Sequence, residues 1–314
     1  MRIVFFGTPE MAVPSLAALA EKHEVAAVVC QPDRPSGRGK SLTPPPTKIW
    51  ALAHGIPVTQ PAKLNDGTFE TWLRDQHPEV CALTAYGRIL KQPILDVAPH
   101  GILNMHPSLL PLYRGPSPIQ SALINGETET GVTIMRLSLD MDAGDILIQE
   151  HTAIDPEETG ETLTNRLATL GGQKLCEAVD RIAAGPAQFK TQDHSRATYC
   201  SLIEKRDGQI DWTKSAQTIH NLVRGAQPWP TAQTIFEGQV FKILRSEIIA
   251  HANKDFAAQP GAIEDVLKDR IVVRAGEDSL ALLTVQAPGK RAMPVGDFLR
   301  GFPIKAGQRF ESFS

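Results

Sequence analysis

An asparagine and a histidine stand two residues apart in the stretch 101–115, which reads GILNMHPSLLPLYRG and follows an apolar segment. On an extended strand, residues i and i+2 face the same side, so the Asn104 carboxamide and the His106 imidazole would project together into one cleft. A carboxamide donates hydrogen bonds, and an imidazole exchanges a proton near neutral pH. The pair by itself leaves open two interpretations, a structural histidine and a reactive site.

An acidic turn, LDMDAGD at 139–145, follows a predicted strand at 132–137 and supplies three carboxylates. A carboxylate beside an imidazole fixes its tautomer and stabilises its charged form, which is the equipment of general acid–base catalysis. The alternative is a solvated acidic turn, and Asp140 and Asp145 are open to that interpretation. Pro107 and Pro111 rigidify the loop after the polar pair, which favours a ligand pocket there.

Apolar runs and helical spacings alternate along the first half of the chain and predict the elements that must position these groups. This alternation predicts an α/β fold with a doubly wound, mostly parallel sheet, in which ligands bind beyond the carboxyl ends of the strands. Neither GxGxxG nor GxxxxGK[ST] occurs, so we predict no dinucleotide or P-loop nucleotide site. The predicted strands are 2–6, 25–30 and 80–84, and the predicted helices are 11–22, 47–54 and 68–76.

A helical pattern at 156–184 completes the first part of the chain, and 185–201 is interpreted as a polar connector. Short Val, Ile and Leu runs then recur at 240–244, 271–273 and 280–285, which is typical of a small β-barrel or sandwich. We therefore predict a catalytic domain over 1–190, a linker over 191–206 and a C-terminal domain over 207–314.

Charge is distributed unevenly between the two parts of the chain. The net charge is −3, but residues 1–204 carry 17 Lys and Arg against 23 Asp and Glu (−6), whereas 205–314 carry 15 against 12 (+3). The net charge argues against a nonspecific nucleic-acid binder, while the mildly basic C-terminal part is compatible with a module that meets a polyanion.

The segment 32–48, PDRPSGRGKSLTPPPTK, contains five prolines and four basic residues and is predicted to form a loop with little regular structure. One interpretation is a solvated surface loop. The other is that the four basic side chains contact phosphate groups, because Lys and Arg bind phosphate backbones. Those side chains are Arg34, Arg38, Lys40 and Lys48.

Other features exclude several classes of protein. No stretch approaches the ~18 consecutive apolar residues that cross a bilayer, and residues 1–7 are too short for a signal peptide, so we expect a cytoplasmic protein without a membrane segment. The four cysteines are scattered, without a CxxC pair or zinc-ligand spacing, so we predict reduced thiols and no metal site.

Taken together, several motifs resemble the 10-formyltetrahydrofolate-dependent formyltransferases. They are NMHPSLLPLYRG, the PIQ at 118–120 with the GVT at 131–133, and the DAG turn at 142–144, in which Asp142 comes 38 positions after Asn104. The resemblance implies 10-formyltetrahydrofolate as co-substrate and a Rossmann-like formyltransferase domain. It also implies that Asn104, His106 and Asp142 are the catalytic residues.

The same resemblance implies two folate-binding loops. One is the turn after the polar pair, made of Ser108, Leu109, Leu110 and Pro111. The other resembles the segment whose backbone receives the pterin ring, made of Tyr86, Gly87, Arg88, Ile89 and Leu90.

Among members of the family, the chain is most similar to those that formylate initiator methionyl-tRNA. The opening IVFFGTPEMAVPSL, the loop PDRPSGRGK, and DGQIDW at 207–212 with Arg224 and PWP at 228–230 carry this similarity. It implies that the basic loop enters the tRNA acceptor arm and that the C-terminal domain is an oligonucleotide-binding type of barrel. Pro107 does not support this substrate, since some tRNA-directed members carry glycine there.

The acceptor amine is left open by the catalytic residues alone. Members that act on an amino sugar nucleotide or on glycinamide ribonucleotide would share the same trio and folate loops. A folate- or RNA-binding module without catalysis is a further alternative. We expect a monomeric enzyme with methionyl-tRNA as its partner.

Overall fold

The computed structural model describes residues 1–36, 41–250 and 259–313, and the chain divides into two compact units. Unit 1 comprises Met1–Pro118, Glu129–Ala153 and Thr164–Cys200, and unit 2 comprises Ile119–Thr128, Ile154–Leu163 and Ser201–Ser314. This division is based on compactness, and it does not show what either unit does. The division into a catalytic domain at 1–190, a linker at 191–206 and a tRNA-contacting domain at 207–314 therefore stays a prediction.

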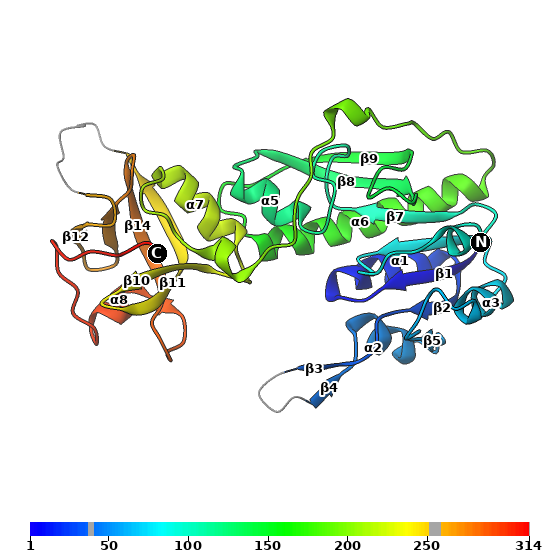
Figure 1. Ribbon diagram of the computed structural model, residues 1–314, viewed down its shortest axis with the longest axis horizontal. Helices are drawn as coiled ribbons and strands as arrows, with labels where there is room; N and C mark the ends of the chain where they lie inside the picture. The colour runs from blue at the N-terminus through cyan, green and yellow to red at the C-terminus, as the bar shows by residue number, and fades with distance from the viewer. Residues whose placement is uncertain (37–40, 251–258, 314) are drawn as a thin grey trace. The chain divides into compact units, whose positions relative to one another are not determined.

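Within the described part of unit 1, seven strands form one sheet in the order β5-β2-β1-β6-β7-β8-β9 (Figure 1). The first five strands run parallel, and β8 and β9 are antiparallel to their neighbours. The predicted mostly parallel sheet is confirmed. The strands are β1 Arg2–Gly7, β2 Glu24–Val29, β5 Val58–Thr59, β6 Val80–Thr84, β7 Ile102–His106, β8 Glu129–Arg136 and β9 Ile146–Ala153.

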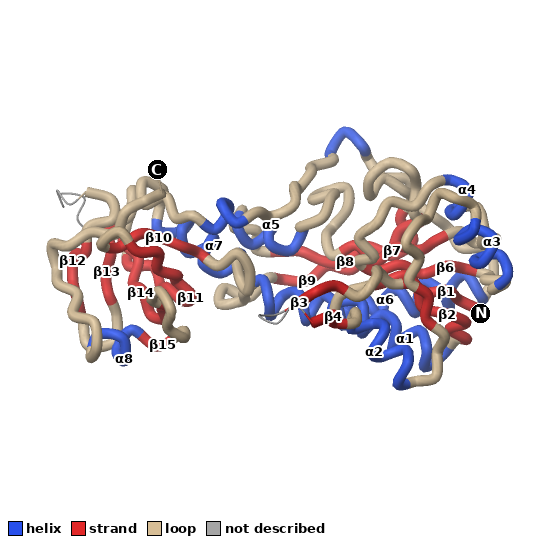
Figure 2. The backbone as a smooth tube through the Cα atoms, turned by 60° about the horizontal axis from the view of Figure 1, so that its bottom comes forward, coloured by secondary structure: helices blue, strands red, loops and turns tan. Residues whose placement is uncertain are grey.

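Helices cover both faces of this sheet because its central strands are apolar on both sides. On one face, Val4 and Phe6 of β1 pack with Phe69 and Leu73 of α3 and Ile94 of α4. On the other face α6 lies against α1, where a Cβ on Gly172 would be 2.8 Å from the Pro14 carbonyl. Figure 2 shows α1 and α6 together on one side of the strands. The helices of unit 1 are η1 Glu10–Ala12, α1 Val13–Lys22, α2 Pro46–Ala53, α3 Thr68–Asp75, α4 Gln92–Leu95, η2 His194–Arg196 and α6 Gly160–Ala183 from Thr164 onward. The helix α5 Pro118–Ile124 and the first residues of α6 belong to unit 2.

The segment 32–48 contains more regular structure than we predict from its prolines. Two strands, β3 Arg34–Ser36 and the exposed β4 Ser41–Thr43, pair as an antiparallel hairpin, and α2 begins at Pro46. Proline holds the backbone at a φ that suits extended structure and the first turn of a helix, so these prolines are compatible with both elements. The prediction of a loop with little regular structure was wrong for the two arms of this hairpin.

The long helix α6 begins at Gly160, four residues later than predicted. Thr159 accepts a hydrogen bond from the Thr162 amide at 3.3 Å, and Glu158 accepts one from the Asp155 amide at 3.1 Å. These side-chain bonds form a turn and an N-cap in place of a first helical turn at 156–159.

Unit 2 contains a second sheet, antiparallel throughout, in the order β10-β11-β14-β13-β12 with β15 beside β14 (Figure 1). Arg309 bridges to Ala262 next to the β12 edge, and Glu311 bridges to Ile235 in the β10 edge. One terminal segment thus links both edges, which closes the sheet into the small barrel that we predict. The elements are η3 Lys205–Gly208, α7 Ala216–Gly225, β10 Ala232–Phe236, β11 Gln239–Ile249, β12 Ile263–Val266, β13 Ile271–Arg274, β14 Ser279–Gln286, β15 Met293–Pro294 and α8 Val295–Leu299.

The DGQIDW motif builds the core of unit 2. Ile210 and Trp212 are buried, and the indole Nε1 of Trp212 donates to Thr234 Oγ1 at 2.9 Å. Trp212 also stacks on Phe310, which belongs to a cluster of phenylalanine rings inside the barrel. The motif therefore has a structural role in this barrel, and this role does not depend on contact with a substrate.

The cysteines bear on the prediction of reduced thiols, and the helices bear on the prediction that the chain has no membrane segment. Cys30, Cys81 and Cys176 are buried and unpaired, and burial raises the pKa of Cys30 to about 11 and that of Cys81 to about 12. Both groups are therefore neutral thiols at physiological pH rather than nucleophiles. Among the described residues, no helix has the length and apolar character needed to cross a membrane.

Candidate active site

Asn104 and His106 occupy the end of β7, in the middle of the unit 1 sheet. Asn104 is in register with Leu83 of the parallel strand β6, and His106 is in register with Thr133 of the antiparallel strand β8. Their positions in one strand place both side chains on the same side of the sheet. Both residues are buried, with only 6% and 5% of their surface exposed. The two groups therefore stand at the carboxyl edge where this class of sheet binds ligands.

Asp142 comes to His106 from the turn that follows β8. Its Oδ2 atom is 3.7 Å from His106 Nδ1 and accepts a hydrogen bond from the Gly115 amide at 2.8 Å. Asp142 has φ of 49°, in the left-handed region that few residues other than glycine adopt. The strained backbone directs the carboxylate toward the imidazole, so the structure brings together two of the three predicted catalytic groups across 36 residues of sequence.

The hydrogen bonds of His106 indicate its tautomer. His106 Nε2 lies 2.9 Å from the carbonyl oxygen of Tyr113, and a carbonyl can only accept, so Nε2 carries a proton. In the neutral ring Nδ1 is then the unprotonated atom, and it faces Asp142. A proton added to the neutral ring would occupy Nδ1, the nitrogen that faces Asp142.

The hydrogen bonding of the Asn104 carboxamide bears on its availability to a ligand. Within the described ranges it makes no hydrogen bond to the protein, although the residue is 6% exposed. A buried amide normally has hydrogen-bond partners, and one without them is suited to donate to a bound molecule. The carboxamide is thus available to a ligand that enters beside His106.

The predicted folate turn after His106 is held by two polar residues, Thr133 and Gln149, to which the sequence analysis gave no role. Thr133 Oγ1 donates to the Ser108 carbonyl at 2.7 Å and accepts from the Leu110 amide at 3.2 Å, while Gln149 Nε2 donates to the Leu110 carbonyl at 2.8 Å. Ser108 Oγ donates to the Leu112 carbonyl at 2.7 Å. No local signal marked these roles, since Thr133 is one of several polar residues of β8 and its register with His106 is set by the sheet.

The other turn residues pack beneath or beside this backbone. Leu110 is buried, whereas Leu109 and Pro111 are partly exposed. A Cβ on Gly131 of β8 would lie 2.1 Å from the Glu150 carbonyl of β9 and 2.4 Å from Leu109 Cδ2, so the close pairing of β8 with β9 requires glycine here.

The second predicted folate loop follows β6 at the same edge. Tyr86 and Leu90 are buried in the core, while Gly87 is exposed and Ile89 is 83% exposed. The Arg88 guanidinium donates to the Pro61 and Ala62 carbonyls at 2.6 and 3.1 Å. The side chains of this loop therefore anchor it, and its backbone between the anchors is accessible to a planar ring.

The predicted tRNA contacts are placed only in part. Arg34 is exposed on β3 and donates to Gln31, whereas Lys48 Nζ lies 2.9 Å from both Asp33 oxygens and 2.8 Å from Gln60 Oε1. Arg38 and Lys40 lie outside the described residues. The ion pair gives Lys48 a structural partner, and its contact with tRNA stays a prediction.

Of the other acidic residues in the turn, Asp140 and Asp145 contribute backbone atoms. The Asp140 carbonyl accepts from Ser138 Oγ at 3.1 Å, and the Asp145 carbonyl accepts from the Arg136 amide at 2.9 Å. These bonds shape the turn that presents Asp142.

A cluster of possible metal ligands forms away from this site. The ligand atoms of His23, Cys176 and Asp180 lie within 4.8 Å of one another. The sequence analysis missed this group because 153 residues separate His23 from Cys176. Asp180 already pairs with the Lys22 ammonium at 3.3 Å and lies 3.2 Å from His23 Nε2, so the carboxylate has a cationic partner without a metal.

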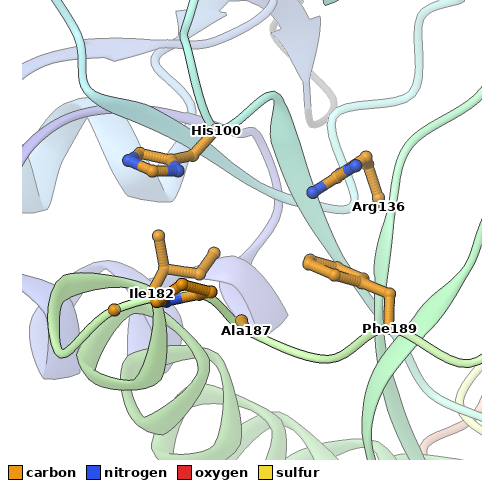
Figure 3. Close-up of a pocket in the computed structure, with 7 residues that line it drawn as sticks. His100, Arg136, Ile182, Ala187 and Phe189 are labelled. Atoms are coloured by element: carbon orange, nitrogen blue, oxygen red, sulfur yellow. The ribbon is translucent and has the colours of Figure 1, made fainter.

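A cavity of about 470 Å³ opens at the opposite end of β7, where the Arg136 guanidinium lies 4.1 Å from the centre of the Phe189 ring. Figure 3 shows Arg136 over this ring, with His100 and Ile182 across the cavity. Arg136 is in register with Leu103, at the far end of the strand from His106. None of the predicted site residues lines this cavity.

Gly115 is the point where the loop after the folate turn approaches the segment that ends unit 1. It has φ of +118°, and a Cβ there would be 2.2 Å from the Cys200 carbonyl oxygen. We expect Gly115→Ala to lower kcat by ~10-fold or more and to lower Tm, because the clash displaces Tyr113 and Gly115, the backbone partners of His106 and Asp142. Steady-state kinetics and thermal unfolding measure both.

Gly55→Ala is the matched control, since Gly55 has φ of +70° and nothing within 4 Å of a Cβ. It carries backbone strain of about 1–2 kcal/mol without the clash and should leave kcat unchanged. Equal kinetics in the two variants would contradict the role given to the Gly115 contact.

The fold and the site define a Rossmann-like enzyme domain that presents Asn, His and Asp at a strand end and carries a small antiparallel barrel. Residues 1–179 match the formyl transferase family and 202–303 match the formyl transferase C-terminal domain. The chain belongs to the formyl transferase family.

Two curated relatives named methionyl-tRNA formyltransferase show the extent of the likeness. The protein of Moorella thermoacetica is 44% identical, with 98% of each chain covered, and that of Geobacter metallireducens is 41% identical, also with 98% of each covered.

Solved structures share the fold at lower identity. The sugar 3N-formyl transferase WlaRD is 19% identical with a TM-score of 0.67, covering 93% of this chain and 99% of that one. HypX from Aquifex aeolicus, solved with tetrahydrofolic acid, is 16% identical with a TM-score of 0.64, covering 96% of this chain and 48% of HypX.

Proposed function

We propose that the chain transfers the formyl group of 10-formyltetrahydrofolate to the α-amino group of initiator methionyl-tRNA, giving N-formylmethionyl-tRNA for translation initiation. The observation that carries the proposal is the likeness over 98% of the chain to relatives named methionyl-tRNA formyltransferase. The exposed hairpin β3–β4 and the net positive charge of residues 205–314 support a polyanionic substrate. We propose a monomeric enzyme that acts in the cytoplasm, where its tRNA substrate is found.

The two loops at the carboxyl edge of the sheet fit a folate. Tyr86 and Leu90 anchor one loop while Gly87 and Ile89 remain exposed, and the other loop is fixed by Thr133 and Gln149. When bound, 10-formyltetrahydrofolate supplies the activated formyl carbon. A flat ring against the backbone of 86–90 and a tail past 108–111 would place that carbon beside the strand end of β7.

The catalytic roles follow from the hydrogen-bonding capacity of each side chain. As the amine nitrogen bonds to the formyl carbon, the formyl oxygen gains negative charge in a tetrahedral intermediate. The carbonyl reforms when the bond from that carbon to N10 breaks. The Asn104 carboxamide, which has no hydrogen bond among the described residues, donates to this oxygen, and His106 donates from a protonated Nδ1. Asp142 stabilises the charged imidazole and relays the amine proton toward N10.

The acceptor is tested by formyl transfer assays with one folate donor and several amines. The purified protein is incubated with 10-formyltetrahydrofolate and, in separate reactions, charged initiator methionyl-tRNA, an amino sugar nucleotide and glycinamide ribonucleotide. We expect product only with the tRNA. Product with the sugar nucleotide alone would establish the alternative acceptor, and no product with any amine would favour a binding module without catalysis.

Arg38→Ala is expected to weaken tRNA binding in a salt-dependent way. Loss of one phosphate contact should raise KM for tRNA and reduce the slope of log KM against log salt by about 1, because one counterion fewer is released on binding. Steady-state kinetics at several salt concentrations measure the slope. Arg74→Ala, which removes an exposed cation paired with Glu70 on α3, is the control and should leave the slope unchanged.

A further inference from the structure

Gln192 holds the backbone on both sides of Asp142, although it lies 50 residues further along the chain. Its Nε2 atom donates to the Asp142 carbonyl at 2.8 Å and to the Gly144 carbonyl at 2.7 Å. Gln192 is 4% exposed, and both protons of its amide are used by these bonds. A single side chain thus ties together the two ends of the peptide that directs the Asp142 carboxylate.

Arg114 orients Gln192 from the other side. The Arg114 NH2 group donates to Gln192 Oε1 at 2.7 Å and lies 2.9 Å from His194 Nδ1, and the residue is 3% exposed. Because guanidinium can only donate, it requires the amide oxygen of Gln192 on its side and the amide nitrogen toward the Asp142 turn. The flip state of Gln192 is thereby determined.

The turn itself has little freedom to reach this geometry in another way. Gly144 packs so closely that a Cβ would lie 1.7 Å from the Arg136 carbonyl, and Asp142 has its backbone in the left-handed region. Strained backbone of this kind persists only where the surroundings hold it. Gln192 supplies the side-chain hydrogen bonds to the carbonyls of this peptide.

The segment around Gln192 is also attached to the loop that supplies the other partners of the site. Tyr113 and Arg114 donate their amides to Thr198 Oγ1 and to the Thr198 carbonyl, at 2.8 and 2.9 Å. The Cys200 amide donates to the Arg114 carbonyl at 2.8 Å. Residues 190–200 belong to the stretch 185–201 that we interpret as a connector from its composition. They therefore border the site within unit 1.

We propose that Gln192, oriented by Arg114, is the positioning residue that holds Asp142 against His106 during formyl transfer. This inference rests on the catalytic role proposed for Asp142. A shift of the carboxylate by about 1 Å is enough to reduce a rate by ~10²-fold. The expected defect of a Gln192 variant is therefore in kcat, with the folate loops undisturbed.

The test is a double-mutant cycle between Gln192→Met, which keeps the side-chain length without the donors, and Asp142→Asn. In the parent enzyme we expect Gln192→Met to lower kcat by about 10²-fold and to leave KM for 10-formyltetrahydrofolate within about twofold. In the Asp142→Asn background it should lower kcat by less than about threefold, because the group it positions is already impaired. An equal loss in both backgrounds would overturn the inference and show a merely structural role.

A second variant distinguishes loss of positioning from loss of folding. Gln192→Glu keeps an acceptor for Arg114 but presents oxygen to the carbonyls of Asp142 and Gly144, so the same loss of kcat is expected. Thermal unfolding of both variants is compared with Gln233→Met, in which a buried glutamine that donates to the Pro230 carbonyl is replaced in unit 2. This control should lower Tm with kcat unchanged.

The cycle also separates this inference from the proposed role of Asp142. Near-normal turnover of the Asp142→Asn enzyme would contradict the role of Asp142 itself. A large loss in Asp142→Asn together with additive effects of Gln192→Met would contradict only the positioning by Gln192.

Discussion

Replacing Asp142 with asparagine is expected to lower kcat by about 10²–10⁴-fold while the protein stays folded. The carboxylate lies 3.7 Å from His106 Nδ1, the atom that gains a proton when the imidazole becomes charged. An asparagine amide keeps the size and still offers an oxygen to the Gly115 amide, but it has no charge to stabilise imidazolium. Transfer of formyl to charged initiator tRNA under single-turnover conditions measures the chemical step.

Asp66→Asn is the matched control for this prediction. Asp66 is an acidic turn residue in the same part of the chain, and its Oδ1 accepts from the Thr68 amide and hydroxyl at 3.2 and 2.6 Å. Its replacement removes a carboxylate without approaching His106, so kcat should remain that of the parent. Similar turnover in the Asp142 and Asp66 variants would remove Asp142 from the mechanism.

Replacing Asn104 with alanine is expected to lower kcat by about 10²–10³-fold, the usual effect of losing one donor to an oxygen that gains charge. The carboxamide makes no hydrogen bond with the described residues, so its removal breaks no bond within them. The loss should therefore appear in the chemical step with little change in Tm. Kinetics and thermal unfolding of the same preparation separate the two quantities.

Asn221→Ala is the matched control for Asn104→Ala, because Asn221 is similarly buried but is expected to affect stability and not turnover. Asn221 is 5% exposed, and its Oδ1 accepts from Arg224 at 3.1 Å and from Gln217 at 3.0 Å. Removing it leaves a buried guanidinium donor without this acceptor, which costs about 1–3 kcal/mol, so Tm should fall and kcat should be retained. If Asn104→Ala lowered Tm like Asn221→Ala and kept kcat, Asn104 would be a structural residue.

The central strands and their helices could be predicted from local pattern. The apolar runs at 2–6 and 80–84 became β1 and β6, and the helical spacing at 68–76 became α3, because strands buried on both faces and amphipathic helices leave a direct signal in sequence. The start of α6 and the β3–β4 hairpin were not predicted, since side-chain caps and the pairing of short exposed strands lack such periodicity.

The amino-acid sequence alone established the types of the candidate catalytic groups and the spacing of Asn104 from His106. One strand carries both of these residues, and the two-residue period of a strand directs their side chains to one side of the sheet. The approach of Asp142 to His106 was decided by the tertiary structure, through an antiparallel strand, a left-handed turn and the amide of Gly115. Gln192 and Arg114 left no local signal at all. The hydrogen bond between Arg114 and Gln192 joins residues 78 positions apart, and it forms only once folding has brought the two segments together. No pattern within a short stretch of sequence predicts such a contact.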